Sequence, residues 1–371
     1  MQFIDLKAQY DHLKNRIDTR IKAVLDHSKF IMGPEVGELE EELSQFVGVK
    51  NTITCANGTD ALQLALMALN IGEGAAVFVP TFTFFASAEA VSFVGATPIF
   101  VDSDNATFNI CTDHLESQIK STIAEGKILP KAIMAVDLFG LPANYPRLKK
   151  IADKYNLKII EDAAQGFGGS INSQMAGSFG DIATTSFFPA KPLGCYGDGG
   201  AVFTDNDNYA DLVRSYRVHG KGKDKYDNVR IGMNSRLDTI QAAILLEKLA
   251  AFPQELVSRN QLAKRYSNAL RGTNKLILPQ IPNGYSTSWA QYTIVSQCRD
   301  AFMSELKASN IPSVIYYGKC MHQQSVYRRQ GQNVGSFPIA DKLSASVFSL
   351  PMHPYMDEES FNKVIFTLKA V

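Results

Sequence analysis

Cysteine is scarce in this sequence, and its arrangement argues against two kinds of site. The 371 residues contain five cysteines, an odd number without paired spacing. Zinc sites and disulfide frameworks both depend on cysteines at recurrent intervals. We therefore predict no metal site, no disulfide framework and a reduced, intracellular chain; the cysteines are Cys55, Cys111, Cys195, Cys298 and Cys320.

An excess of one charge and long apolar runs are also missing. The 37 basic and 37 acidic side chains cancel, so the overall charge favours neither nucleic acid nor an anionic membrane as a partner. No stretch approaches the roughly 20 apolar residues of a membrane span. Residues 1–18 are charged and amphipathic and lack the apolar core of a signal peptide. We expect a cytoplasmic protein with a small-molecule ligand.

Apolar residues make up 45% of the chain, enough for one large core and a smaller second one. Between residues 50 and 205, short β-branched or apolar runs alternate with helical patterns. This alternation predicts an α/β fold with a large, mostly parallel sheet, whose ligands bind at the carboxyl ends of the strands. The runs cover residues 52–55, 76–80, 97–102, 131–137, 157–162, 182–188 and 200–204.

From about Asp238 the pattern changes to long helices, followed by short strands such as residues 289–296 and an amphipathic helix near 357–370. We therefore expect a large domain over residues 1–245 and a smaller α+β domain over residues 246–371. Pro253 and the stretch 279–288 are the expected hinge and loop, because proline and glycine interrupt regular structure.

Three segments of the large domain could carry chemistry. The first joins a predicted strand to an apolar helix that begins at Gly58 and Thr59, where free amides and the helix dipole can hold a phosphate. The alternative is that Asn57 only caps a core helix. The second segment places Asp162 at the end of a strand, where a carboxylate can pair with a cationic ring nitrogen or merely cap the next helix.

The third segment, SFFPAKPLGCYGDGGAVFT, places Lys191 between Ser186 and a group of glycines. A lysine in a dry pocket has a lowered pKa and can form a Schiff base. The alternative is a surface charge on an ordinary loop. The three segments together supply a phosphate cradle, a partner for a ring nitrogen and a Schiff-base lysine, which are the protein parts that a pyridoxal phosphate site requires.

On these motifs, the chain resembles the fold-type I, pyridoxal phosphate-dependent sugar-nucleotide aminotransferases of the DegT/StrS family along almost its whole length. The resemblance implies an aspartate aminotransferase-like fold. It is especially close to the branch that acts on UDP-2-acetamido-2-deoxy-ribo-hexuluronate. The motifs are GPEVGELEEEL, CANGTDALQLAL, VPTFTFFAS, EDAAQGFG, SFFPAKPLGCYGDGGAVFT, RVHG, GMNSRLDTIQAAILLEKL and SLPMHPYM.

The resemblance implies a role for each cofactor residue. Lys191 would be the catalytic residue bound to the cofactor aldehyde, and Asp162 would pair with the ring nitrogen. Phe84 would lie against the ring face, although Phe82 or Phe85 could do so instead, or Phe84 could pack in the core. The other contacts would be Gly58, Thr59 and Ser186 to the phosphate, Gln165 to the ring hydroxyl, and Asn234 to the phosphate of a neighbouring subunit.

Asn234 makes the implied enzyme a homodimer with shared active sites. Arg236 would bind a substrate anion or form a salt bridge to Asp238, and His219 would contact substrate or a backbone carbonyl. The segment with Tyr317 and His322 would lie near the sugar nucleotide. It departs from the family pattern of tyrosine-proline-x-proline-leucine, which leaves the exact substrate open; the differing residues are Gly318, Lys319, Cys320 and Met321.

The implied reaction moves an amino group from L-glutamate to the 3-keto group of a UDP-2-acetamido-2-deoxy-hexuluronic acid, for surface polysaccharides such as O-antigen. The alternatives are amino transfer to another keto-deoxy sugar nucleotide, at C3 or C4 and linked to UDP or dTDP, and sugar dehydration. The dehydratase branch has histidine where this chain has Lys191. A dehydrogenase would need a G-x-G-x-x-G run after an early strand. A relative that binds cofactor without chemistry also fits the motifs.

Overall fold

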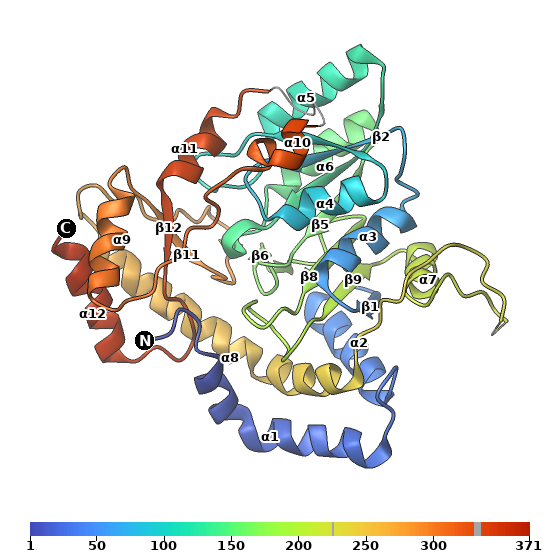
Figure 1. Ribbon diagram of the computed structural model, residues 1–371, viewed down its shortest axis with the longest axis horizontal. Coiled ribbons are helices and arrows are strands. Elements are labelled where there is room, and N and C mark those ends of the chain that lie inside the picture. The colour runs from blue at the N-terminus through green and yellow to red at the C-terminus, as the bar shows by residue number, and fades with distance from the viewer. Residues whose placement is uncertain (225, 330–334) are drawn as a thin grey trace.

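The computed structural model describes residues 1–224, 226–329 and 335–371 (Figure 1). Its centre is a seven-stranded sheet in the order β1-β9-β8-β5-β4-β2-β3, in which β9 is antiparallel to both neighbours and the other four pairs are parallel. This confirms the predicted α/β fold. The strands are β1 (Asn51–Cys55), β2 (Ala75–Pro80), β3 (Thr97–Val101), β4 (Leu129–Val136), β5 (Lys158–Asp162), β8 (Ile182–Ser186) and β9 (Gly200–Thr204).

Helices cover both faces of this sheet because its buried strands present apolar side chains on both sides. In β4, for example, Met134 packs into the core under α3, α4 and α7, whereas Ile133 packs into the core under α5 and α6. The helices of the first face are α3 (Gly58–Ala68), α4 (Phe85–Phe93) and α7 (Asp207–Tyr216); those of the second are α5 (Thr112–Glu125) and α6 (Tyr145–Tyr155).

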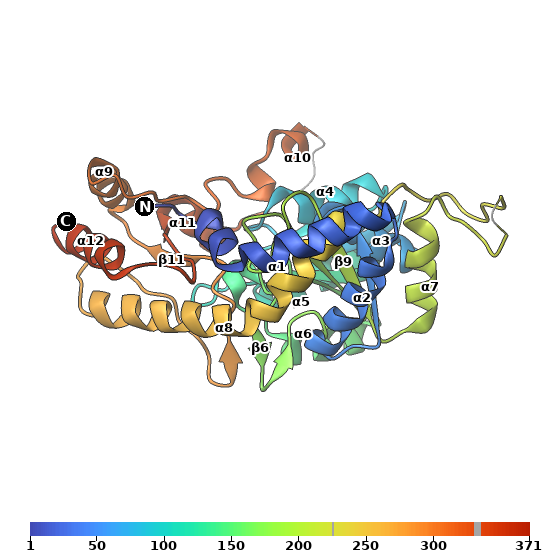
Figure 2. The ribbon, with the colours of Figure 1, turned by 90° about the horizontal axis from the view of Figure 1, so that it is seen from below.

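A 32-residue helix, α8 (Thr239–Leu270), joins the sheet to the carboxyl-terminal part of the chain (Figure 2). Pro253, the expected hinge, lies inside this continuous helix rather than in a loop. Although proline cannot donate the usual helical hydrogen bond, packing on either side holds α8 together. Phe252 lies in a core with sheet residues and Tyr266 in the core of the small domain. The predicted boundary at residue 245 therefore falls within a helix.

The first two helices, α1 (Leu6–His27) and α2 (Pro34–Val47), pack against α8. The small domain pairs β11 (Tyr292–Val295) with β12 (Val347–Leu350) and covers them with α9 (Arg299–Ala308) and α12 (Glu358–Lys369). The remaining elements are short: β6 (Ser170–Ile171), β7 (Gln174–Met175), β10 (Tyr285–Ser286), η1 (Leu138–Gly140), η2 (Met321–Gln323), α10 (Ser325–Arg329) and α11 (Pro338–Ser346).

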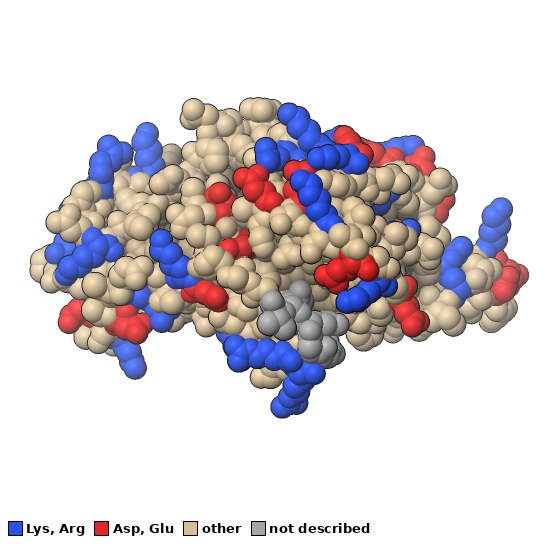
Figure 3. Space-filling view, turned by 90° about the horizontal axis from the view of Figure 1, so that it is seen from above, with Lys and Arg blue, Asp and Glu red and all other residues tan. Residues whose placement is uncertain are grey.

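The surface mixes both signs of charge. Figure 3 shows basic and acidic side chains interspersed over one face of the molecule, as the equal numbers of basic and acidic residues lead us to expect. Within the described ranges, no helix combines the length and apolar character that crossing a membrane requires.

Candidate active site

A cavity of about 460 Å³ lies at the carboxyl ends of β4, β5 and β8, beside the start of α3. This is the edge of the sheet where the sequence predicts ligand binding. The small domain and the amino-terminal segment close the other side. The cavity brings together eight predicted site residues: Gly58, Thr59, Phe84, Asp162, Gln165, Ser186, Lys191 and Tyr317.

One end of the cavity is built to hold an anion. Asn57 caps α3 by accepting a hydrogen bond from the Asp60 amide at 2.8 Å, and no partner for the Gly58 and Thr59 amides occurs among the described residues. A Cβ on Gly58 would lie 2.6 Å from the Cβ of Ser186, so only glycine allows this close approach. The free amides, the helix dipole and the Ser186 hydroxyl together suit a phosphate group.

Asp162 and Lys191 place opposite charges in the same cavity. The carboxylate of Asp162 accepts hydrogen bonds from Ser87 Oγ at 2.9 Å and from the Ala164 amide at 3.2 Å. Burial lowers the pKa of the Lys191 amine, and the charge of Asp162 partly offsets this. Burial likewise raises the pKa of Asp162, while Lys191 lowers it. Within the described chain, Lys191 Nζ has no hydrogen-bond partner, which leaves a nucleophilic amine free to react.

The aromatic wall is formed by Phe84 and Tyr317. The Phe84 ring lies 6.1 Å from the Tyr317 ring at an angle of 40° and is 54% exposed, whereas Phe82 is 1% exposed. Of the three phenylalanines that the sequence offers for this position, Phe84 is the one that lines the cavity. Gln165 fixes the tyrosine, since its Nε2 donates to Tyr317 Oη at 2.9 Å while its Oε1 accepts from the Phe139 amide at 2.7 Å.

The model of the DegT/DnrJ/EryC1/StrS aminotransferase family matches residues 11–369. The chain belongs to this family. The match confirms the predicted family, and it includes every residue assigned above to the anion-binding end, the charged pair and the aromatic wall.

Relatives of this aminotransferase agree in sequence and in fold. A UDP-2-acetamido-2-deoxy-3-oxo-D-glucuronate aminotransferase from Pseudomonas aeruginosa is 42% identical over 368 residues, 99% of each chain. A solved DegT/DnrJ/EryC1/StrS aminotransferase from Brucella abortus is 50% identical with a TM-score of 0.97, over 100% of this chain and 99% of that one. Bacillus subtilis NtdA, solved with bound cofactor PMP, is 29% identical with a TM-score of 0.90, over 99% and 84% of the two chains.

Behind Asp162, the aminotransferase holds a buried pair of carboxyl groups that the sequence did not reveal. Glu161 and Asp137 are both 0% exposed, and Asp137 Oδ2 has no hydrogen-bond partner among the described residues. The charge of Glu161 disfavours ionisation of its neighbour Asp137. Burial raises the pKa of Glu161 to about 7 and that of Asp137 well above its usual value. Adjacent residues of a strand point to opposite faces, so Glu161 points away from the cavity that Asp162 faces.

Three predicted residues lie outside the cavity of this single chain. His219 and Asn234 are exposed, and Asn234 forms a bridge with Val218. Arg236 is half-buried, and the part of the chain that is described shows no ion pair between Arg236 and Asp238. Their predicted contacts with cofactor or substrate therefore need a second subunit or a movement of this segment.

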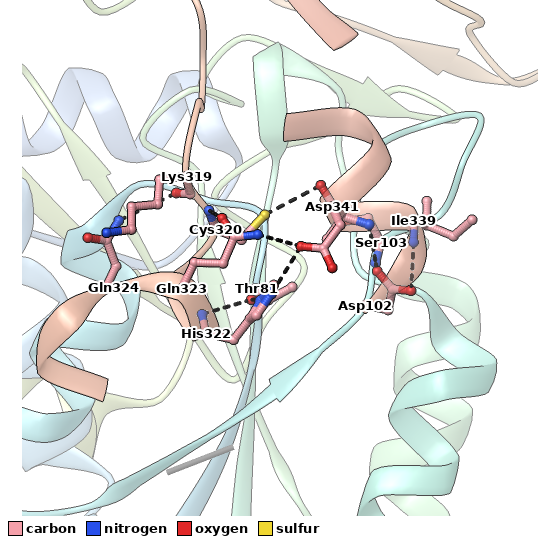
Figure 4. A network of polar contacts seen from close by, with 11 residues as sticks. Thr81, Asp102, Ser103, Lys319, Cys320, His322, Gln323, Gln324, Ile339 and Asp341 are labelled. Carbon is pink, nitrogen blue, oxygen red and sulfur yellow. Dashed lines mark hydrogen bonds and ion pairs between the residues drawn. The ribbon is translucent and has the colours of Figure 1, made fainter. Parts of the chain in front are cut away.

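His322 also lies away from the cavity, in the network of Figure 4. Its Nδ1 hydrogen-bonds Thr81 Oγ1 at 2.7 Å, and its Nε2 lies 3.1 Å from Asp341 Oδ1. Sγ of Cys320 donates to the Ala340 carbonyl at 3.4 Å. The possible metal ligands of Cys320, His322 and Asp341 lie within 4.8 Å of one another, yet each has a protein partner. In this chain, His322 connects η2 to Thr81 after β2 and to Asp341 of α11.

Sequence reasoning missed several residues of the cavity wall, and four of them show where in the chain such residues come from. Ile4, Asp198, Gln291 and Tyr316 line the cavity beside the predicted residues. Asp198 follows Lys191 by seven residues in the glycine-rich segment and could have been included on that ground. The other three come from the amino-terminal segment and the small domain, which tertiary packing brings to the sheet.

Proposed function

We propose that this family member transfers an amino group from L-glutamate to a keto sugar nucleotide, with pyridoxal 5'-phosphate as its cofactor. The observation that carries the proposal is the free Lys191 amine, which shares a cavity with Asp162 and with the anion-binding start of α3. The PMP bound to Bacillus subtilis NtdA supports the choice of cofactor.

The residues present fit this cofactor at three points. Gly58, Thr59 and Ser186 would hold its phosphate, because the close approach at Gly58 brings two free amides and a hydroxyl together. Asp162 would keep the ring nitrogen protonated by direct charge pairing. Lys191 would bond its aldehyde. When bound, pyridoxal phosphate supplies an aldehyde that exchanges amines and a ring that accepts electrons from the adjacent carbon.

Lys191 then does the proton transfer. Burial lowers the pKa of its amine, so a larger fraction is neutral near pH 7 and able to accept a proton from the α-carbon of glutamate. The same Nζ returns a proton to the sugar carbon when the amino group is delivered. Phe84 and Tyr317 line the cavity and keep bulk water away from these atoms.

For the acceptor, we propose the 3-keto form of a UDP-2-acetamido-2-deoxy-hexuluronic acid. The Pseudomonas aeruginosa relative, whose name contains a 3-oxo sugar of this kind, matches 99% of this chain. The product would serve surface polysaccharide synthesis. We propose that the enzyme acts in the cytoplasm, since its five cysteines show no paired spacing.

We also propose a homodimer with shared active sites. The cofactor phosphate and the sugar-linked diphosphate are anions, yet Lys191 is the one basic residue among the described residues of the cavity wall, which also holds Asp162 and Asp198. The missing positive charge must come from elsewhere. Arg236 and Asn234 of a second copy, which lie outside the cavity of their own chain, would supply these contacts.

Replacing Lys191 tests the function. We expect K191A to lower turnover of a keto sugar nucleotide with L-glutamate by about 10⁴-fold, because the amine acts as both nucleophile and proton carrier. The wild-type protein should be yellow with pyridoxal phosphate and should lose its visible absorption band on addition of glutamate, whereas K191A should not respond at a comparable rate. The exposed Lys150, changed to alanine, is the control. Normal transamination by K191A would contradict the proposal.

A further inference from the structure

We propose that Gln291 selects the sugar: its side-chain oxygen accepts a hydrogen bond from a hydroxyl or amide N–H of the keto sugar nucleotide. The inference rests on the proposed function and adds a specificity-determining residue to the same site. Gln291 lies directly before β11 in the small domain and contributes to the cavity wall opposite the sheet.

The side chain of Gln291 is held without a partner. The residue is 9% exposed, and its Oε1 has no hydrogen-bond partner among the residues described. Its backbone is fixed, since its amide donates to the Phe139 carbonyl at 3.4 Å. A buried amide oxygen without a hydrogen bond lowers the stability of the fold. Its presence in a native protein therefore indicates a role in ligand binding or another function.

The strand pattern determines where this amide points. Tyr292 and Ile294 of β11 lie in the core of the small domain, and neighbouring residues of a strand alternate between faces. Gln291 and Thr293 therefore face the opposite way, toward the sheet domain. Gln291 thus lines the cavity from the position directly before β11.

Several other polar residues of the wall already have partners. Gln165 hydrogen-bonds to Phe139 and Tyr317. Asp162 accepts hydrogen bonds from Ser87 and Ala164. Ser186 accepts one from the Phe188 amide. Gln291 is therefore a polar group whose bonding is completed only when something enters the cavity.

A buried water is the competing explanation. Gln291 also borders a hollow of about 20 Å³, which could hold one water molecule. A buried water needs two to four polar partners, whereas the hollow is lined largely by apolar residues such as Phe108, Leu138 and Trp289. The larger cavity is the better source of a donor.

The chemistry of the two substrates favours the sugar. L-Glutamate brings two carboxylates, which only accept hydrogen bonds, and one amine, which is used at the reacting carbon near Lys191. A nucleotide sugar brings hydroxyl groups and, in the proposed acceptor, an acetamido N–H. An amide oxygen therefore matches a donor that the sugar has and glutamate lacks.

The test separates the two halves of the reaction by rapid mixing and follows the cofactor absorbance with glutamate alone and with sugar alone. In Gln291→Met, which keeps the length and removes the amide, we expect kcat/KM of the sugar half-reaction to fall about 10- to 100-fold. The glutamate half-reaction should stay within about twofold. Gln291→Glu, which keeps an acceptor oxygen, should recover most of the loss. Gln280→Met is the matched control, because Gln280 borders the small hollow but not the cavity.

Two further measurements exclude a merely structural role. The thermal midpoint of substrate-free Gln291→Met should equal or exceed that of the wild type, since the unpaired amide is removed. A panel of UDP-linked keto sugars that each lack one hydroxyl or acetamido group should contain one member that the wild type discriminates against and Gln291→Met does not. Any of three results would overturn the inference. The sugar half-reaction could be normal in Gln291→Met, the thermal midpoint of this variant could be lowered, or Gln291→Glu could lose as much kcat/KM as Gln291→Met. Failure of both half-reactions in the wild type would instead overturn the proposed function.

Discussion

At the scale of single residues, burial decides which ionisable groups can do chemistry. Lys191 and Asp162 share a cavity. Burial disfavours the charged form of each, whereas the opposite charge of the other residue favours it. Asp137 and Glu161 are as buried but have no cation partner in the described network, so burial and the charge of Glu161 raise the pKa of Asp137. The first pair can react with a ligand, whereas the second supports the strand end that carries Asp162.

The buried acid pair should make stability depend on pH. Folding raises the pKa of Asp137 above its unfolded value of about 4. Its favourable contribution to folding is therefore fully present below pH ~4 and is lost as the pH rises toward the folded pKa. Asp137→Asn cannot ionise, so the stability of this variant relative to the wild type should rise by up to about 1.4 kcal/mol per pH unit within that range.

Urea unfolding of Asp137→Asn and wild type at pH 5 and pH 8 measures this difference. The exposed Asp153, changed to asparagine, is the control and should show little pH-dependent difference. A difference between Asp137→Asn and wild type that is the same at both pH values would mean that folding does not raise the pKa of Asp137.

At the scale of elements, α8 determines how the two cores are connected. The helix passes from the core that contains Phe252 to the core that contains Tyr266, and Pro253 lies between them on the exposed side. A proline within a helix removes one hydrogen bond and crowds the preceding turn. Here the helix continues because both flanking segments are packed.

We therefore expect Pro253→Ala to strengthen α8 without affecting catalysis. Restoring the amide should raise the free energy of unfolding by about 1–3 kcal/mol, reduced by the greater freedom of the unfolded chain. Urea unfolding and steady-state kinetics test this. If Pro253 were a hinge for domain closure, kcat and KM would change together in the variant, and that result would refute the assignment of a continuous rigid helix.

At the scale of the whole molecule, the cavity of one subunit has too few basic residues to bind the anionic groups of its proposed substrates. The cavity wall offers Lys191, while Arg236 lies outside it. If Arg236 of one copy completes the site of the other, mixing the inactive variants K191A and R236A should restore activity. A dimer of K191A and R236A then contains one site with both residues intact.

Refolding or co-expressing K191A with R236A should therefore restore up to about a quarter of the wild-type activity, since half of the dimers are mixed and half of their sites are intact. Each variant alone should remain nearly inactive. A K191A/R236A double variant mixed with K191A is the control and should recover nothing. If R236A alone proves fully active, or if mixing restores nothing, Arg236 does not act across subunits.

The sequence alone determined which candidate residues meet at the sheet edge. Gly58 begins a helix, Asp162 and Ser186 end strands, and Lys191 lies in the loop after β8. Parallel strands bring such positions to one edge of the sheet. The alternation of apolar runs also predicted all seven strands of the main sheet. Both inferences depend on short-range patterns, which can be followed along the chain.

Only the tertiary structure decided what covers that edge. Ile4, Gln291 and Tyr316 reach the cavity because the amino-terminal segment and the small domain pack against the sheet. The pairing of Asp137 with Glu161 and the continuity of α8 through Pro253 likewise depend on packing between distant segments. These features have no local signature, because the free energy that fixes them comes from burial of surfaces far apart in the sequence.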